Sequence, residues 1–96
     1  MRPSIAFESH RKAIRRIVEE NHARNARIFG SVLHGDDREN SDLDLLIDPI
    51  QDTTLMDIAR IQNQLQVLLG VPVDVLTPKA LPEQFRDEIL KEAKLI

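Results

Sequence analysis

Apolar residues recur at helical spacing in three stretches of this chain. The i, i+3, i+4 pattern runs over residues 8–22, 54–69 and 81–94, and it predicts an amphipathic helix in each stretch. Ser9 is the predicted N-cap of the first helix, because its hydroxyl can accept from a free backbone N–H group. Pro82 falls at the start of the third stretch, where proline suits the first helical turn.

The middle and last of these helices carry further signals. Thr54 and Asp57 have the spacing of a capping box, and Gly70 stands where a glycine commonly ends a helix. The last helix is predicted to bury one side against the rest of the protein. That side consists of Phe85, Ile89, Leu90 and Ala93.

Three shorter stretches have patterns that are typical of strands. Residues 26–29 form a short apolar run, residues 43–47 alternate between apolar residues and aspartate, and residues 71–76 alternate valine with other residues. Gly30 follows the first strand, and Pro49 ends the second.

The segment between the first two strands is predicted to contain a brief helical turn at 31–35 and an exposed loop at 36–41. The expected order is then helix, strand, helical turn, strand, helix, strand, helix. Helices that alternate with strands favour an α/β fold, here a small mixed sheet with packed helices. A length of 96 residues is expected to form one domain, residues 1–96.

Composition excludes several classes of function. The chain has no cysteine, which excludes disulfides and thiolate metal sites and fits a reducing cytoplasm. A net charge of −3 gives no basic footprint, so direct binding of duplex nucleic acid is not expected. No apolar run approaches the roughly 20 residues of a membrane span. We therefore expect a cytoplasmic protein without a membrane segment.

The candidate chemistry is carried by three aspartates. Asp42 and Asp44 are one residue apart in a predicted strand, so their side chains would share a face with Cα atoms about 6–7 Å apart. Asp74 lies in the next strand, and it joins the pair if the two strands are neighbours. Such carboxylates can hold Mg²⁺ together with substrate phosphates. Each aspartate taken alone is equally an ordinary exposed residue, but aspartate is disfavoured in strands, and the repetition suggests a use.

A second candidate element is the turn after the first strand. Gly30 and Ser31 can offer backbone N–H groups and a hydroxyl to a phosphate. Gly35 would let the loop turn back close to a bound triphosphate. Rival sites fail on spacing: no EF-hand pattern fits, no Walker GK[ST] is present, and three scattered histidines lack zinc-ligand spacing.

These parts together resemble the minimal nucleotidyltransferases of the DNA polymerase β superfamily. Their signature is Gly-Ser, ten residues, Asp-x-Asp and a later carboxylate, and the order of elements also agrees over nearly the whole chain. The resemblance implies a polymerase beta-like nucleotidyltransferase fold that uses ATP and two Mg²⁺ ions. The implied catalytic and metal-binding residues are Asp42, Asp44 and Asp74, and the implied nucleotide-binding residues are Gly30, Ser31 and Gly35.

Members of this size resemble the antitoxin half of toxin–antitoxin pairs. That resemblance implies transfer of AMP from ATP to a tyrosine hydroxyl of a partner, a helical HEPN-type ribonuclease toxin, which silences the toxin. Two alternatives remain open from the sequence. One is an antitoxin that neutralises the toxin by binding alone, without catalysis. The other is nucleotidyl transfer to a small molecule or an RNA end.

Two features bear on nucleotide and partner binding. The family commonly has Arg before the second glycine, where this chain has His34, and a neutral imidazole is a weaker phosphate partner than a guanidinium. His34 is equally well interpreted as a loop residue without a role. The apolar side of the last helix, with Leu95 and Ile96, is a candidate partner surface, although these two residues can also simply close the core.

Overall fold

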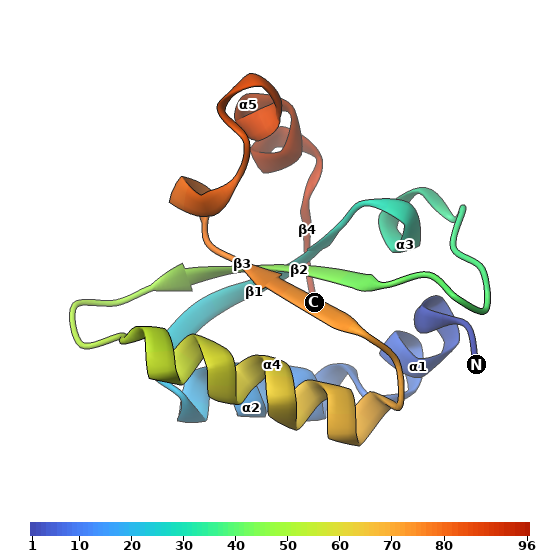
Figure 1. Ribbon diagram of the computed structural model, residues 1–96, viewed down its shortest axis with the longest axis horizontal. Helices are drawn as coiled ribbons and strands as arrows, with labels where there is room; N and C mark the ends of the chain where they lie inside the picture. The colour runs from blue at the N-terminus through green and yellow to red at the C-terminus, as the bar shows by residue number, and fades with distance from the viewer.

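The structure is a computed structural model that describes residues 1–96, and it is built on one mixed sheet (Figure 1). The strand order is β3-β2-β1-β4. β1 runs antiparallel to both β2 and β4, whereas β2 and β3 are parallel. The predicted α/β fold with a mixed sheet is therefore confirmed. The strands are β1 (Ala23–Phe29), β2 (Leu43–Pro49), β3 (Val73–Leu76) and β4 (Lys94–Leu95).

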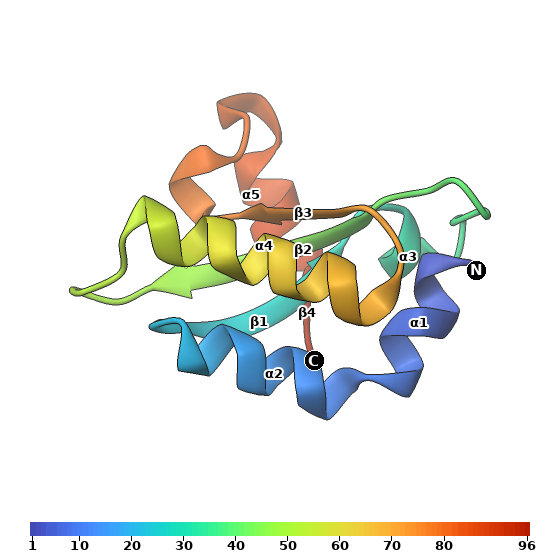
Figure 2. The same cartoon turned by 60° about the horizontal axis from the view of Figure 1, so that its bottom comes forward.

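Helices cover the two faces of the sheet unequally (Figures 1 and 2). α1, α2 and α4 lie on one face, while α5 and a short 3₁₀ helix, η1, lie over the other. α3 is a single turn that follows β1 directly. The helices are α1 (Pro3–Ser9), α2 (Arg11–Glu20), α3 (Ser31–His34), α4 (Leu55–Leu69), η1 (Pro78–Ala80) and α5 (Glu83–Glu92).

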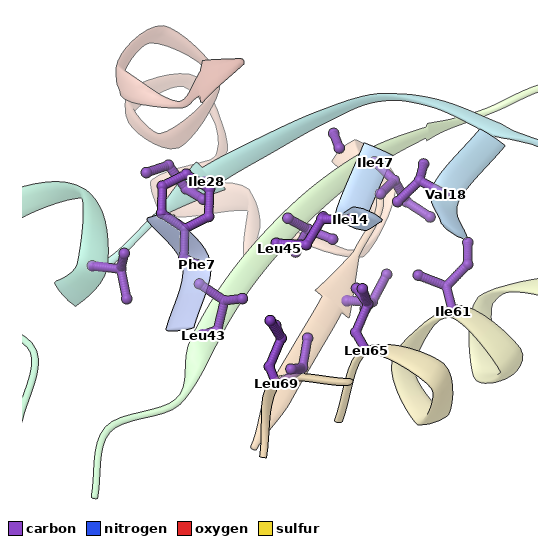
Figure 3. Packing of buried hydrophobic residues seen from close by; sticks show 14 of the residues in the cluster. Phe7, Ile14, Val18, Ile28, Leu43, Leu45, Ile47, Ile61, Leu65 and Leu69 are labelled. Atoms are coloured by element: carbon purple, nitrogen blue, oxygen red, sulfur yellow. The ribbon is translucent and has the colours of Figure 1, made fainter. Parts of the chain in front are cut away.

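The hydrophobic core is divided by the sheet into a large and a small cluster. The large cluster contains 17 buried residues and lies between the sheet and α1, α2 and α4 (Figure 3). Leu43, Leu45 and Ile47 enter it from β2, as the period-two pattern predicts. The small cluster has only three buried residues, Phe29, Leu46 and Leu81, and lies under α5.

The predicted first helix, residues 8–22, corresponds to α2 and the end of α1, a helix that the pattern does not predict, and the prediction of Ser9 as an N-cap is wrong. Ser9 is the last residue of α1, and its hydroxyl donates to the carbonyl of Ile5 at 3.1 Å. His10 separates α1 from α2 with φ −131°, and its ring Nδ1 lies 2.9 Å from the carbonyl oxygen of Ala6. The side chain of His10 thus bonds a carbonyl at the end of α1, where the chain bends (Figure 2).

The loop at 36–41 is not exposed throughout, contrary to the prediction, because Asp37 is only 3% exposed. Its carboxylate accepts from the backbone N–H of Ser4 at 2.8 Å and pairs with the Arg2 guanidinium at 3.3 Å. Burial alone would raise the pKa of Asp37, but these hydrogen bonds and the charge of Arg2 outweigh it and lower the pKa. Asp37 therefore caps the first turn of α1 and ties the loop to it.

The signals at the ends of α4 are confirmed. Asp57 donates its backbone N–H to the Thr54 hydroxyl at 3.2 Å, and its carboxylate accepts the Thr54 backbone N–H at 2.9 Å. This backbone hydrogen bond, with His22 and Arg60 nearby, lowers the pKa of Asp57 to about 2. Gly70 ends the helix at φ 68°.

The C-terminal part differs from the prediction in detail. β3 begins at Val73, and α5 ends before a short strand, β4, that the sequence pattern does not predict. Phe85 is 51% exposed, so it does not belong to the buried side of α5. The other predicted members of that side, Ile89, Leu90 and Ala93, pack against the small cluster. Ile96 packs against the large cluster, whereas Leu95 is 64% exposed. None of the helices has the length and apolarity needed to cross a bilayer.

Candidate active site

The structure brings Asp44 and Asp74 side by side. They are directly paired in the parallel register of β2 and β3, and Cα atoms paired in this way lie about 5 Å apart. The predicted adjacency of the two strands is therefore confirmed. Both side chains point to the α5 face, because their neighbours in each strand point to the large core. Those neighbours are Leu43, Leu45, Val73 and Val75.

Asp42 lies one residue before β2 begins. The buried Leu43 separates it from Asp44, and the Leu43 N–H donates to the carbonyl of Pro72 at 2.9 Å, which continues the β2–β3 pairing to this point. Asp42 and Asp74 are exposed, whereas Asp44 is half-buried. The carboxylates do not converge on a single point in this conformation, since no three acidic or histidine side chains have metal-binding geometry.

Asp44 is nevertheless coupled electrostatically to both other aspartates. Burial, and then the charges of Asp74 and Asp42, raise the pKa of Asp44 to about 6. None of these three carboxylates takes part in an ion pair. Asp48, further along β2, differs because it pairs with Arg27 and accepts from Asn25. Three neighbouring carboxylates without a cationic partner are a donor set that fits Mg²⁺, a cation that takes oxygen ligands.

Gly30 is required by the position of Asp44. It has φ 74° and ψ −149°, a conformation that is essentially confined to glycine. A Cβ on Gly30 would overlap the Oδ2 atom of Asp44. The backbone after β1 can therefore approach the half-buried carboxylate only because this residue has no side chain. The pairing of Phe29 with Asp44 across β1 and β2 sets this approach.

The remaining two predicted nucleotide-binding residues lie at the two ends of α3. Ser31 is the first residue of this helix and is partly exposed. Gly35 ends the helix at φ 73°, and no atom lies within 4 Å of the place where its Cβ would stand. Backbone conformation, rather than lack of space, therefore explains glycine at this position. The predicted approach of Gly35 to a triphosphate stays a prediction.

One group of residues near the site is not evident from the sequence. An open pocket of about 380 Å³ lies between α3 and the junction of α5 with β4. Among its residues only His34 stands out in the sequence, and its Nε2 lies 3.3 Å from the Glu92 carboxylate. The pocket is lined by Leu33, His34, Lys91, Glu92 and Lys94. These residues come from segments far apart in the chain, so no local spacing reveals them.

Comparisons with known proteins identify the family of this chain. The family model described as "Polymerase beta, Nucleotidyltransferase" matches residues 12–96. A Methanocaldococcus jannaschii protein assigned as protein adenylyltransferase MJ0435 is 35% identical over 80% of this chain and 83% of its own length. Protein adenylyltransferase MntA of Thermococcus cleftensis is 30% identical over 88% of this chain and 82% of its own length.

Solved structures share the fold. A structure assigned as a minimal nucleotidyltransferase has a TM-score of 0.87 and 36% identity, covering 97% of this chain and 95% of that chain. A toxin–antitoxin structure with AMP-PNP has a TM-score of 0.73, covering 88% of this chain and 69% of that chain. Its sequence identity is only 17%, so this second likeness concerns the fold alone.

Proposed function

This chain belongs to the polymerase beta nucleotidyltransferase family, and on that premise we propose that it is an antitoxin that transfers AMP from ATP to a tyrosine hydroxyl of a HEPN-type ribonuclease toxin. The observation that carries the proposal is the group of Asp42, Asp44 and Asp74 on one sheet face, with Gly30 against Asp44. The relatives that are named protein adenylyltransferases support a protein as the acceptor.

The three aspartates are the residues that would hold Mg²⁺, and we propose two ions. When bound, the metal would supply positive charge to the phosphates and to the acceptor oxygen. Ser31 donates its hydroxyl, and the backbone at Gly30 its N–H, to phosphate oxygens. Gly35 lets the loop close over them. In this proposal all of these groups act at the same end of the sheet.

The transfer itself is an in-line displacement. The tyrosine oxygen forms a bond to the α-phosphorus of ATP, the bond from that phosphorus to the bridging oxygen breaks, and pyrophosphate leaves with the electron pair. Asp74, exposed on β3, accepts the proton of the tyrosine hydroxyl as the new bond forms. Asp44 is paired with Asp74 across β2 and β3 and is the most buried of the three aspartates.

The open position of the site supports a protein acceptor. Asp42 and Asp74 are exposed, and the small cluster under α5 leaves this face less covered than the other. A partner that brings its own surface can therefore present a tyrosine to the carboxylates. A toxin–antitoxin structure with AMP-PNP shares this fold, and we propose a toxin as this partner and ATP as the donor. We propose that the pair meets in the cytoplasm.

The test is incubation with ATP labelled at the α-phosphate, Mg²⁺ and a purified HEPN-type ribonuclease toxin. We expect label on a toxin tyrosine, located by mass spectrometry, and loss of ribonuclease activity. Asp42→Asn should abolish labelling, while the matched control Asp52→Asn, an exposed aspartate in the turn after β2, should not.

Other outcomes separate the alternatives. A toxin of unmodified mass that is inhibited equally by the natural chain and by Asp42→Asn would favour binding without catalysis. Label on RNA or on a small molecule, with none on the toxin, would instead identify a different acceptor.

A further inference from the structure

The exposed Asp42 stands at the end of the loop that joins α3 to β2. On one side of it, the Leu43 N–H donates to the Pro72 carbonyl at 2.9 Å, so pairing with the segment before β3 fixes the chain there. On the other side, the backbone runs through residues 36–41, which belong to no helix or strand. The position of Asp42 therefore depends on how firmly this loop is held.

Arg2, Ser4 and Asp37 hold the loop against the start of α1, and we call these three residues the N-terminal anchor. The Asp37 carboxylate accepts from the Ser4 N–H at 2.8 Å. Arg2 contacts Asp37 twice: its Nε donates to the Asp37 backbone carbonyl at 3.1 Å, and its Nη2 donates to Oδ1 of the carboxylate at 3.3 Å. Figures 1 and 2 show the first turn of α1 beside this loop. The anchor therefore fixes both the backbone and the side chain of one loop residue.

The part of the loop between Asp37 and Asp42 is a closed turn. The Arg38 N–H donates to the Ser41 hydroxyl at 2.8 Å, and the Ser41 N–H donates back to the Arg38 carbonyl at 3.0 Å. Asp37 is the only buried residue among residues 36–41. Because the turn is closed by its own hydrogen bonds, a displacement of Asp37 is passed on to Asp42 instead of being absorbed between them.

Two members of the N-terminal anchor lie outside the family match. The nucleotidyltransferase model matches residues 12–96, whereas Arg2 and Ser4 precede residue 12. The anchor is therefore a feature of this chain beyond the part that the family model describes.

We propose that Arg2 and Asp37 are positioning residues that order Asp42 for the divalent cation, an inference that rests on the proposed function. Neither residue touches the metal in this proposal. A ligand whose backbone is already ordered binds more tightly, because the free energy of ordering is not taken from binding. Substitution of residues that orient metal ligands commonly weakens metal binding by about 10- to 100-fold.

The experiment titrates the natural chain and its variants with Mn²⁺, which takes the same oxygen ligands as Mg²⁺, and follows free Mn²⁺ by electron paramagnetic resonance. The decisive variant is Arg2→Gln. Loss of a positive charge would by electrostatics alone strengthen cation binding, whereas loss of the anchor should weaken it by about tenfold. The matched control is Arg38→Gln, since Arg38 lies in the same loop and takes part in no ion pair. This control should bind Mn²⁺ at least as tightly as the natural chain.

Amide hydrogen exchange without metal examines the order of the loop directly. In Arg2→Gln the Ser41 and Leu43 N–H groups should exchange about tenfold faster, while those of α4 keep their rates. Arg2→Lys keeps the charge but cannot reproduce both guanidinium contacts, so its Mn²⁺ affinity should lie between those of Arg2→Gln and the natural chain. The Arg2 side chain is 44% exposed, so both variants should fold, as circular dichroism can check. A role limited to stabilising α1 would speed exchange in α1 alone and leave Mn²⁺ affinity unchanged.

Three results would overturn the inference. They are unchanged Mn²⁺ affinity in Arg2→Gln, an equal loss of affinity in Arg38→Gln, and absence of Mn²⁺ binding by the natural chain. If the natural chain labels the toxin while Arg2→Gln needs no more Mg²⁺ for half-maximal labelling, the anchor does not position Asp42 and the proposed function stands. If Arg2→Gln weakens Mn²⁺ binding but the natural chain labels no toxin, the proposed function fails and the positioning role stands.

Discussion

The two faces of the sheet differ in what they contain. The face under α1, α2 and α4 is packed with 17 buried hydrophobic residues, whereas the α5 face has three, together with aspartates that no cation neutralises. Strand β2 contributes to both, since Leu43, Leu45 and Ile47 point one way and Asp44 the other. Alternate residues of this one strand therefore contribute to hydrophobic packing and to the candidate site.

The largest effect on activity is expected when the aspartates on the α5 face of the sheet are neutralised. Asp44→Asn or Asp42→Asn should lower the rate of nucleotide transfer by about 10³-fold, because charge stabilisation in the transition state is lost. The circular dichroism spectrum and the cooperativity of unfolding should stay unchanged. Transfer at the natural rate by a well-folded Asp44→Asn protein would refute the assignment of this residue.

Substitutions on the opposite face of the sheet should change the stability of the protein rather than its activity. Leu45→Ala removes a fully buried side chain from the large cluster and should lower the free energy of unfolding by about 2–4 kcal/mol. Ile89→Ala, in the partly buried side of α5, should cost about 1 kcal/mol or less. Urea unfolding of both variants measures the difference. Equal losses in the free energy of unfolding would show that packing on the two faces of the sheet contributes equally to stability, contrary to the difference described above.

A smaller effect is expected in the pH dependence of stability. The pKa of Asp44 is raised to about 6, so between about pH 4 and pH 6 the folded chain keeps a proton that the unfolded chain releases. The contribution of Asp44 to stability is therefore favourable at low pH and is lost as the pH rises through this window. Asp44→Asn removes this titration and should be about 1–2 kcal/mol more stable than the natural chain at neutral pH, after allowance for solvent screening.

The measurement is urea unfolding of both proteins at several pH values. Their difference in stability should shrink as the pH approaches the ordinary aspartate range. A difference that does not change with pH would mean that Asp44 is not destabilised by burial and by its acidic neighbours.

The smallest expected effect belongs to Ser31. Ser31→Ala should reduce transfer by about tenfold or less, because the hydroxyl donates only one hydrogen bond and the backbone N–H groups remain. Steady-state kinetics with varied ATP would show the change. A loss as large as that of Asp44→Asn would place Ser31 among the residues on which the chemistry depends.

The sequence predicts the features that depend on local patterns. The alternation over residues 43–47 predicts β2, and the Thr54–Asp57 spacing predicts the start of α4. The adjacency of Asp44 and Asp74 follows once the strands that carry them are neighbours in an α/β sheet. These parts of the candidate site are therefore evident from the amino-acid sequence.

Features that depend on distant contacts could not be predicted. Asp37 caps a helix 33 residues away, and nothing in its own neighbourhood signals burial. The two residues of β4 are too short to show a period, and they are ordered only by pairing with Arg27 and Ile28. The pocket lined by His34, Lys91 and Lys94 likewise forms only when β4 brings the end of α5 beside α3.

The contact of Gly30 with Asp44 also constrains how such chains can diverge. A side chain at position 30 would need a different backbone and the space that the Asp44 carboxylate occupies. Glycine at 30 should therefore be replaced only in descendants that have already given up the acid at 44. A survey of related genes can test whether the acid is lost before the glycine, and both changes should be found together in descendants that no longer transfer nucleotides.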